Sequence, residues 1–269
     1  MNKKAISILL TAAMGVSVLA AGTVTVSAAE KKDKYVIGMS QCNLGEPWRV
    51  AMNDQIAMAA EKHPEFEVIF ADAAQDNSKQ IADIENFVQM GVDLIIASPN
   101  EATPLTNAVS AAYDAGIPVI SYDRLIKSDA VSYYISFDNY TVGTLQGQYV
   151  VDSLDLDNAG DKTYNIEFTA GDPADNNAGY FFNGAFDVLK PYIDAGTLNV
   201  VSGQTDFDSV ATPAWDTQTA LERMQNILAS YYADGTQLDV ALCSNDSTAL
   251  GVTQAIESDY AGDNTVLIT

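Results

Sequence analysis

Short apolar segments alternate with longer amphipathic segments along the chain, and this alternation restricts the possible folds more than any other feature. In the first half, strand-like apolar segments cover residues 35–39, 67–71, 94–97, 118–122 and 133–137. Helical patterns lie between them at residues 48–62, 78–90 and 104–115. Short apolar strands separated by helices indicate right-handed βαβ units around a parallel sheet.

The same pattern continues in the second half of the chain, where an acidic stretch at residues 155–161 interrupts it. Strands are predicted at residues 164–169, 198–202, 240–243 and 266–268, and helices at residues 142–154, 178–189, 213–229 and 248–257. We therefore expect an α/β protein with two doubly wound parallel-sheet lobes joined by a hinge near residues 137–140. The predicted N-terminal lobe covers residues 30–137 and the C-terminal lobe residues 138–269. Open parallel sheets bind ligands outside the carboxyl ends of their strands, which predicts a ligand in the cleft between the lobes.

The first 29 residues have the features of a secretory signal peptide. Lys3 and Lys4 precede an uncharged apolar run at residues 5–21, and small residues follow at 26–29. A membrane anchor is the alternative, but the run is short and diluted by Thr, Ser and Gly. Gly22 stands where a lipoprotein would carry its acylated cysteine. We therefore expect an exported protein without a lipid anchor, periplasmic or extracellular at the cell envelope.

The last predicted strand ends at Thr269 with no helix after it. An uncovered edge of a parallel sheet is unusual in a finished domain. The pattern therefore predicts that the C-terminal end of the protein is missing from this chain.

The charge excludes several classes of partner. The formal net charge is -23, and cleavage of the signal peptide would remove two lysines and no acid. Such an acidic surface repels phosphate backbones and anionic lipid headgroups, so we expect no nucleic-acid partner and no binding to a membrane surface. Hydrophobic residues make up 48% of the chain, enough for a packed core.

The two cysteines leave two interpretations open. Cys42 and Cys243 both lie at or just after the end of a predicted strand, and an exported protein could join them in a disulfide. The predicted topology puts them in different lobes, where a bridge would restrict hinge motion. Two inert buried thiols are the favoured interpretation, because buried cysteine behaves as a small hydrophobic residue.

Polar and aromatic residues follow the predicted strands where a ligand would bind. Trp48 and Arg49 fall in the opening turn of the first helix, where Trp48 could stack on a sugar ring and Arg49 could donate to its hydroxyl groups. The alternative is a core tryptophan and a solvated arginine. Asp123 and Arg124 follow the fourth strand and suit a polyol, although alone they could form a surface salt bridge.

Two further polar groups repeat this geometry in the second half. Asp175, Asn176 and Asn177 follow one strand, and Asn245 and Asp246 follow another. Helix capping by itself accounts for each of these two groups. Polar groups at four strand ends together predict a ligand site.

Catalytic and metal-binding patterns are missing from the sequence. His63 is the only histidine and precedes a proline at a helix end, which predicts a solvated position. No Ser-His arrangement, zinc-ligand spacing or phosphate-binding loop is present. Asp155, Asp157 and Gly160 resemble a calcium loop, but Ala159 stands where an oxygen ligand is expected. We therefore expect no enzymatic activity, no cofactor and no metal.

With these residues identified, the chain resembles bacterial sugar-binding proteins of the type I periplasmic-binding fold, nearest the xylose-binding and multiple-sugar-binding receptors. The stretches that carry the resemblance are residues 122–126 (Tyr-Asp-Arg-Leu-Ile), 175–178 (Asp-Asn-Asn-Ala), 189–192 (Leu-Lys-Pro-Tyr) and 244–246 (Ser-Asn-Asp). It covers essentially everything after the signal peptide.

The resemblance implies a set of sugar-contacting residues: Asp123, Arg124, Asp175, Asn177, Trp215 and Asp246. It also implies that Trp215 stacks on the sugar, the alternative being a core tryptophan, and that Asn245 contacts the ligand or braces its neighbour. The first loop departs from the xylose-type pattern, because Pro47 precedes Trp48 and Arg49 follows it. This order resembles the ribose-binding pattern, so the identity of the sugar stays open.

The expected function is that of a monomeric extracytoplasmic receptor. It would bind a monosaccharide, a pentose or a hexose, and deliver it to the membrane permease of an ABC importer. One alternative is the effector-binding domain of a sugar-responsive regulator or sensor, and a regulator would need a DNA-binding helix-turn-helix where this chain has its signal-like segment. The other alternative is an exported α/β enzyme.

Overall fold

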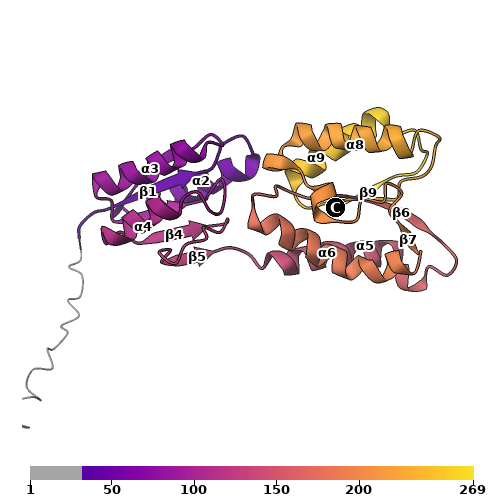
Figure 1. Ribbon diagram of the computed structural model, residues 1–269, viewed down its shortest axis with the longest axis horizontal. Helices are drawn as coiled ribbons and strands as arrows, with labels where there is room; N and C mark the ends of the chain where they lie inside the picture. Colours follow the sequence, from indigo (N-terminus) through magenta and orange to yellow (C-terminus); the bar gives the residue numbers. More distant parts are fainter. Residues whose placement is uncertain (1–31) are drawn as a thin grey trace, which may run out of the picture. The chain divides into compact units, whose positions relative to one another are not determined.

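The computed structural model describes residues 32–269, and the predicted signal peptide lies outside the described residues. Two parallel sheets are present (Figure 1). The first has the strand order β2-β1-β3-β4-β5. Its strands are β1 (Tyr35–Gln41), β2 (Phe66–Asp72), β3 (Leu94–Ala97), β4 (Val119–Tyr122) and β5 (Tyr133–Ile135).

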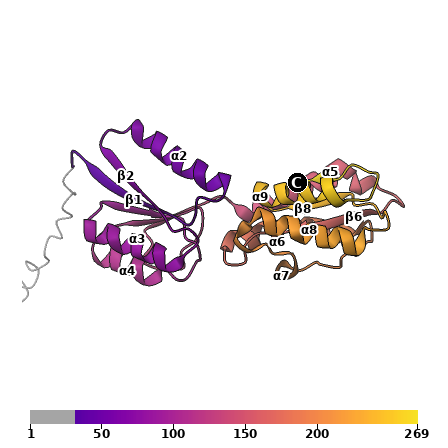
Figure 2. The same ribbon diagram turned by 90° about the horizontal axis from the view of Figure 1, so that it is seen from above.

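Helices lie on both faces of the first sheet. Figure 2 shows α2 on one face and α3 and α4 on the other. Their bounds are Pro47–Glu61 for α2, Asn77–Met90 for α3 and Thr106–Asp114 for α4. The ends of α3 follow from local chemistry, because Asp76 accepts hydrogen bonds from the N–H groups of Ser78 (2.7 Å) and Lys79 (3.2 Å). Gly91 then ends the helix in the left-handed conformation, with φ of 67°.

The second sheet has the strand order β7-β6-β8-β9, again all parallel. Its strands are β6 (Tyr164–Thr169), β7 (Leu198–Asn199), β8 (Val240–Cys243) and β9 (Leu267–Ile268). The long helices are α5 (Asn139–Leu154), α6 (Asn176–Asp194), α8 (Thr217–Tyr231) and α9 (Asp246–Asp259). Figure 1 shows α5 and α6 on one face of this sheet and α8 and α9 on the other. The doubly wound α/β fold is therefore confirmed, and the lobe boundaries at residues 137 and 138 stay a prediction.

Glycines allow the helices of the second half to pack closely. A Cβ atom at Gly143 of α5 would overlap the backbone carbonyl of Phe181 in α6, and one at Gly184 of α6 would overlap the carbonyl of Tyr140. Any side chain at these positions would push the two helices apart. This close contact places α5, the first helix after β5, firmly against the second half of the chain.

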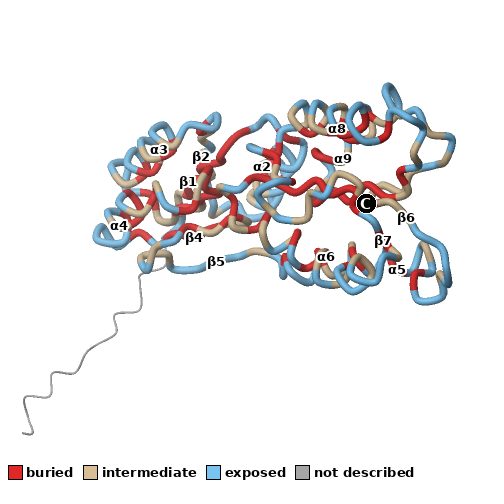
Figure 3. The backbone as a smooth tube through the Cα atoms, turned by 45° about the vertical axis from the view of Figure 1, so that its right-hand side comes forward, coloured by how far each residue is buried: buried red, intermediate tan, exposed pale blue. Residues whose placement is uncertain are grey.

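Buried apolar side chains fill the space between each sheet and its helices. Figure 3 shows the buried backbone concentrated in the strands and the exposed backbone on the outer turns of the helices. Ile84, Phe87 and Ile95 belong to the core of the first half, and Phe168 and Leu242 to that of the second. The apolar strand pattern in the sequence therefore marks the core in both halves.

One predicted helix is interrupted, which corrects the expected helix over residues 213–229. Residues Pro213–Trp215 form a short 3₁₀ turn, η2, and α8 begins only at Thr217. Ala214 and Trp215 have φ values of 59° and 57°, which an α-helix does not allow. Asp216 starts the new helix by accepting a hydrogen bond from the N–H of Thr219 (2.7 Å). The short helices α7 (Phe207–Val210) and η1 (Leu156–Asn158) were not expected either, and β7 is shorter than the predicted strand.

Both cysteines are free and buried, so the interpretation as separate thiols is confirmed. Burial raises the pKa of the Cys243 thiol to about 12, which keeps it protonated and unreactive. The His63 side chain is more than half exposed, as expected. Among residues 32–269, no helix is both long and apolar enough to cross a bilayer.

Candidate ligand-binding cavity

A cavity of about 350 Å³ lies at the carboxyl ends of strands from both sheets. This volume falls in the usual range for small-molecule sites. Nearly all of the predicted site residues line it, from both halves of the chain: Trp48, Arg49, Asp123, Asp175, Asn177, Trp215, Asn245 and Asp246. Arg124 is the one predicted residue that is not part of the lining.

Arg49 and Asp123 form a buried ion pair on the side of the first sheet. The Nη1 atom of Arg49 donates to Oδ2 of Asp123 at 2.6 Å and to Oγ of Ser98 at 3.1 Å. Asp123 directly follows β4 with φ of 65°, a left-handed conformation that turns the chain sharply at the strand end. Burial by itself lowers the pKa of the Arg49 guanidinium, but the neighbouring Cys42 and Asp123 outweigh burial and raise it. Arg49 is therefore a buried, permanently charged donor, and the alternative of a solvated arginine is wrong.

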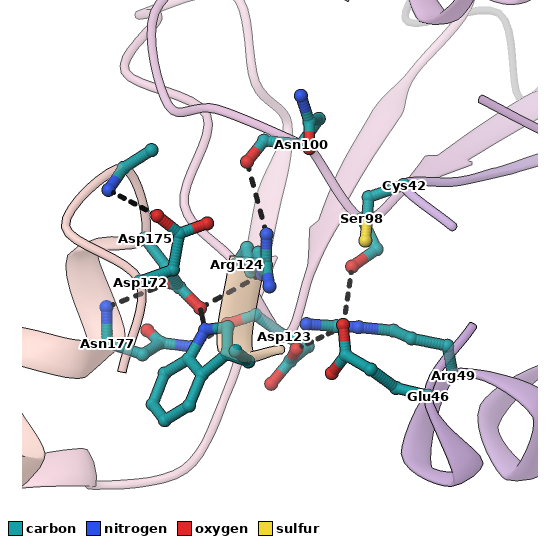
Figure 4. Close-up of polar contacts among 12 residues, drawn as sticks. Cys42, Glu46, Arg49, Ser98, Asn100, Asp123, Arg124, Asp172, Asp175 and Asn177 are labelled. Atoms are coloured by element: carbon teal, nitrogen blue, oxygen red, sulfur yellow. Dashed lines mark hydrogen bonds and ion pairs between the residues drawn. The ribbon is translucent and has the colours of Figure 1, made fainter. Parts of the chain in front are cut away.

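Arg124 forms a second buried ion pair, which joins the two halves. Its Nε atom lies 2.9 Å from Oδ2 of Asp175, and both side chains are 2% exposed. Its Nη1 atom donates to the carbonyl of Asn100 at 3.1 Å, so the guanidinium lies between Asn100 and Asp175 (Figure 4). The alternative of a surface salt bridge is wrong. Because Arg124 is enclosed behind the cavity wall, it holds Asp175 in place in this structure.

Asn177 also links the two halves. Its Nδ2 atom donates to the carbonyl oxygen of Asp123 at 3.0 Å, and its Oδ1 atom accepts from the hydroxyl of Tyr134 at 3.4 Å. Asn177 lies in the first turn of α6, whose cap Asp175 accepts from the N–H of Asn177 at 3.0 Å. The capping interpretation for this group is therefore correct, and the same residues also line the cavity.

The two tryptophans differ in their surroundings. Trp215 is 4% exposed, its Nε1 atom donates to Oδ2 of Asp175 at 3.1 Å, and its ring meets Phe181 edge-on at 6.2 Å between centroids. Trp48 is 48% exposed and lies 6.1 Å from Phe137, so the alternative of a core tryptophan is wrong for Trp48. Both indoles line the cavity, where aromatic faces favour the apolar C–H side of a ring.

Asn245 and Asp246 lie where β8 leads into α9. Asn245 caps α9 by accepting from the N–H of Thr248 at 3.0 Å, and its side chain also lines the cavity. Asp246 is exposed in the first turn of α9, where the helix dipole favours its negative charge. Both therefore combine a capping or helix-end role with a place in the cavity wall.

Several lining residues were not predicted as site residues: Glu46, Phe137, Val142, Gln146, Phe181 and Ser244. Ser244 directly precedes Asn245 and Glu46 lies two residues before Trp48, so their neighbours in the sequence could have indicated them. Gln146 and Phe181 lie within α5 and α6, away from any strand end. No pattern in the sequence distinguishes these two from other helical residues.

The pKa of a buried carboxyl group behind the cavity is raised. Burial raises the pKa of Asp172 above its ordinary value of 3.8, and the nearby negative charge of Asp175 adds to this effect. The N–H of Ala174, which donates to Asp172 at 3.0 Å, and the charge of Arg124 act in the opposite direction. Ionised Asp172 therefore costs folding free energy at neutral pH.

We predict that Asp172→Asn is more stable than the wild-type protein at neutral pH. The folded state binds the Asp172 proton more tightly than the unfolded chain, so stability falls as the pH rises from 3.8 through the raised pKa. Asparagine removes this penalty and keeps an oxygen for the Ala174 N–H. Thermal unfolding should show a higher midpoint, by about 2–4 °C for each kcal/mol gained. The difference in unfolding midpoint between the variant and the wild-type protein should disappear as the pH falls toward 3.8.

An exposed acid gives the control. Asp263→Asn changes the charge by the same amount in an exposed loop and should leave the midpoint nearly unchanged at every pH. If the difference in unfolding midpoint between Asp172→Asn and wild type became larger at acidic pH, the prediction would be contradicted.

The cavity wall combines aromatic faces with charged and amide hydrogen-bonding groups, an arrangement suited to a small polyhydroxylated ring. In the part of the chain that the structure describes, no group of three or more His, Cys, Asp or Glu side chains could hold a metal ion.

Comparison with known proteins identifies the family. A family model described as a periplasmic binding protein domain matches residues 37–269. The multiple sugar-binding periplasmic protein SbpA of Azospirillum brasilense is 38% identical over 91% of this chain and 67% of its own length. The receptor ChvE of Rhizobium radiobacter is 43% identical over 68% of this chain and 51% of its own length. This chain thus spans about half to two thirds of these relatives.

A solved structure agrees with this result. An ABC transporter solute binding protein from Clostridium phytofermentans, crystallised with β-D-glucose, has 44% sequence identity and a TM-score of 0.83. The match covers 87% of this chain and 71% of that protein. With two doubly wound parallel sheets and a family match from residue 37 to residue 269, the chain belongs to the periplasmic binding protein family.

Proposed function

We propose that this protein is an exported receptor that binds a monosaccharide between two lobes and delivers it to the permease of an ABC importer. The observation that carries the proposal is the cavity, which combines two indole rings with a charged and amide hydrogen-bonding wall. Aromatic faces hold the C–H side of a sugar ring, and paired carboxylate and guanidinium groups bind its hydroxyls. We propose as ligand contacts Trp48, Arg49, Asp123, Asp175, Asn177, Trp215, Asn245 and Asp246, with Arg124 behind them.

The relatives support this assignment. SbpA and ChvE are multiple sugar-binding periplasmic proteins, and the Clostridium phytofermentans protein holds β-D-glucose. A pentose or a hexose is therefore the proposed ligand, bound by a monomer and released unchanged. Hydrogen bonds between the halves, from Asn177 to Asp123 and from Tyr134 to Asn177, support a closed form that a transporter could recognise.

Calorimetry against a panel of pentoses and hexoses tests the proposal. We expect saturable binding of at least one monosaccharide, no binding of amino acids or nucleotides, and recovery of the sugar unaltered after prolonged incubation. If no pentose or hexose gave a binding signal, sugar binding would be refuted. Conversion of the sugar into a product would show an enzyme instead.

A sensor role is the second candidate. The fructose-binding periplasmic domain of a hybrid two-component system, BT1754, is 32% identical with a TM-score of 0.68 over 83% of this chain. A similar module can therefore belong to a signalling protein. Sugar uptake by cells with and without the gene separates the two roles, because a receptor for an importer is required for uptake and a sensor is required only for the transcriptional response.

A further inference from the structure

The cavity carries more negative than positive charge. Among residues 32–269, four acidic side chains line it, Glu46, Asp123, Asp175 and Asp246, whereas Arg49 is the only cation in the wall. Arg124 lies behind the wall and is ion-paired to Asp175. Two cations against four acids leave a formal charge of two minus four, or −2, around the ligand position at neutral pH.

The ion pairs neutralise only half of these acids. Arg49 pairs with Asp123 and Arg124 pairs with Asp175. In residues 32–269, neither Glu46 nor Asp246 has an ion-pair partner of its own. Glu46 is only 9% exposed, and its Oε1 atom accepts one bond from the amide Nδ2 of Asn43 at 3.2 Å. A buried carboxylate with one neutral donor favours a cationic or donating ligand group beside it.

Several hydrogen-bond donors of the wall are already used within the protein, and free acceptor atoms remain. The Nε1 atom of Trp215 and the Nδ2 atom of Asn177 already donate within the protein. Gln146 donates through Nε2 to the carbonyl of Cys243 at 3.1 Å, which leaves its buried Oε1 atom without a partner. The unpartnered donors Arg49 Nε and Arg124 Nη2 belong to guanidinium groups whose charge a carboxylate already matches. Hydroxyl or ammonium groups of a ligand can therefore donate to the free oxygen atoms of the wall.

From this charge and hydrogen-bond inventory we infer that the cavity selects neutral sugars and, above all, amino sugars with an ammonium group, and rejects sugar acids. Glu46 and Asp246 set this selection because neither forms an ion pair within residues 32–269, although Arg49, which is already paired with Asp123, also attracts Glu46. Hydroxyl and ammonium groups donate to the free acceptors. A sugar carboxylate would only accept, and it would bring a third uncompensated negative charge into the cavity. This inference rests on the proposed sugar-binding function.

Calorimetry on matched sugars at neutral pH tests the inference. The sets are glucose, glucosamine, N-acetylglucosamine and glucuronate, and the corresponding galactose series. We expect glucosamine or galactosamine to bind at least as tightly as its neutral parent, and the uronate to bind at least about tenfold more weakly. The N-acetyl sugars are bulky but uncharged at nitrogen, so they separate the effect of charge from the effect of size. Added salt should reduce the difference in Kd between the amino sugars and the uronates.

Two variants assign the selection to its residues. The ratio of the uronate Kd to the neutral-sugar Kd should fall in both Glu46→Gln and Asp246→Asn. The expected decrease is several-fold in each variant, up to about tenfold. Glu61→Gln, at the far end of the same helix as Glu46, makes the same charge change outside the cavity and should leave the ratio unchanged. Asp246 is exposed, so its variant provides the test if Glu46→Gln does not fold.

The outcomes separate this inference from the proposed function. A uronate that binds as tightly as the neutral parent overturns the inference and leaves sugar binding intact. An unchanged Kd ratio in both variants overturns the role of Glu46 and Asp246. Failure of every sugar to bind overturns the inference and the proposed function together.

Discussion

Replacing Trp215 by alanine is expected to lower the free energy of unfolding by about 3–5 kcal/mol and to weaken sugar binding at the same time. The ring is buried against Phe181, and a Cβ atom at Gly171 would overlap it, so truncation opens a void under the cavity wall. The hydrogen bond from its Nε1 atom to Asp175 is also lost, which leaves Asp175 less firmly held. Chemical denaturation and calorimetry on the same variant measure both effects.

Trp48 provides the matched control for this experiment. It also lines the cavity but is half exposed, so Trp48→Ala should weaken binding while changing stability by less than about 1 kcal/mol. From the sequence, Trp215 was either a ligand-stacking residue or a core residue, and its surroundings now combine both. A Trp215→Ala protein as stable as wild type would contradict the prediction, as would one with unchanged sugar affinity.

Replacing Arg49 by alanine is expected to lower the free energy of unfolding by about 3–5 kcal/mol and to abolish measurable sugar binding. The change leaves the Asp123 carboxylate without its ion-pair partner and the Ser98 hydroxyl without its donor. It also raises the net negative charge of the cavity and removes the one cation that the described residues contribute to its wall. Urea denaturation gives the stability change, and calorimetry with the best-binding sugar gives the affinity.

An exposed ion pair gives the control for Arg49. Lys190 and Asp194 form an i,i+4 pair at 2.7 Å with both side chains more than half exposed. Lys190→Ala should therefore cost only about 0.3–0.5 kcal/mol and leave sugar binding unchanged. If Arg49→Ala were no more destabilising than Lys190→Ala, the buried pair would not contribute as we expect.

Most of the fold could be predicted because its elements are encoded locally. The strands β3 and β8 are runs of apolar residues, and helices cover both faces of the sheets to which they belong. Caps such as Asp76 and stops such as Gly91 mark helix ends within a few residues of sequence. The break before α8 was missed because Ala214 and Trp215 carry no signal for a left-handed backbone. In the folded protein, the Trp215 ring contacts Phe181 and donates to Asp175, and these contacts join residues far apart in the sequence.

The sequence by itself determined which polar and aromatic residues follow the strands, because every parallel strand delivers its next residues to the same edge of the sheet. Only the tertiary structure decided how they pair. Arg49 lies in the first turn of α2 and Arg124 follows β4, yet Arg49 lines the cavity and Arg124 is enclosed behind Asp175. Likewise, α6 packs against α5 and brings Phe181 and Gln146 to the same wall. Such contacts join residues far apart in the chain, and their geometry depends on the packing of the two halves.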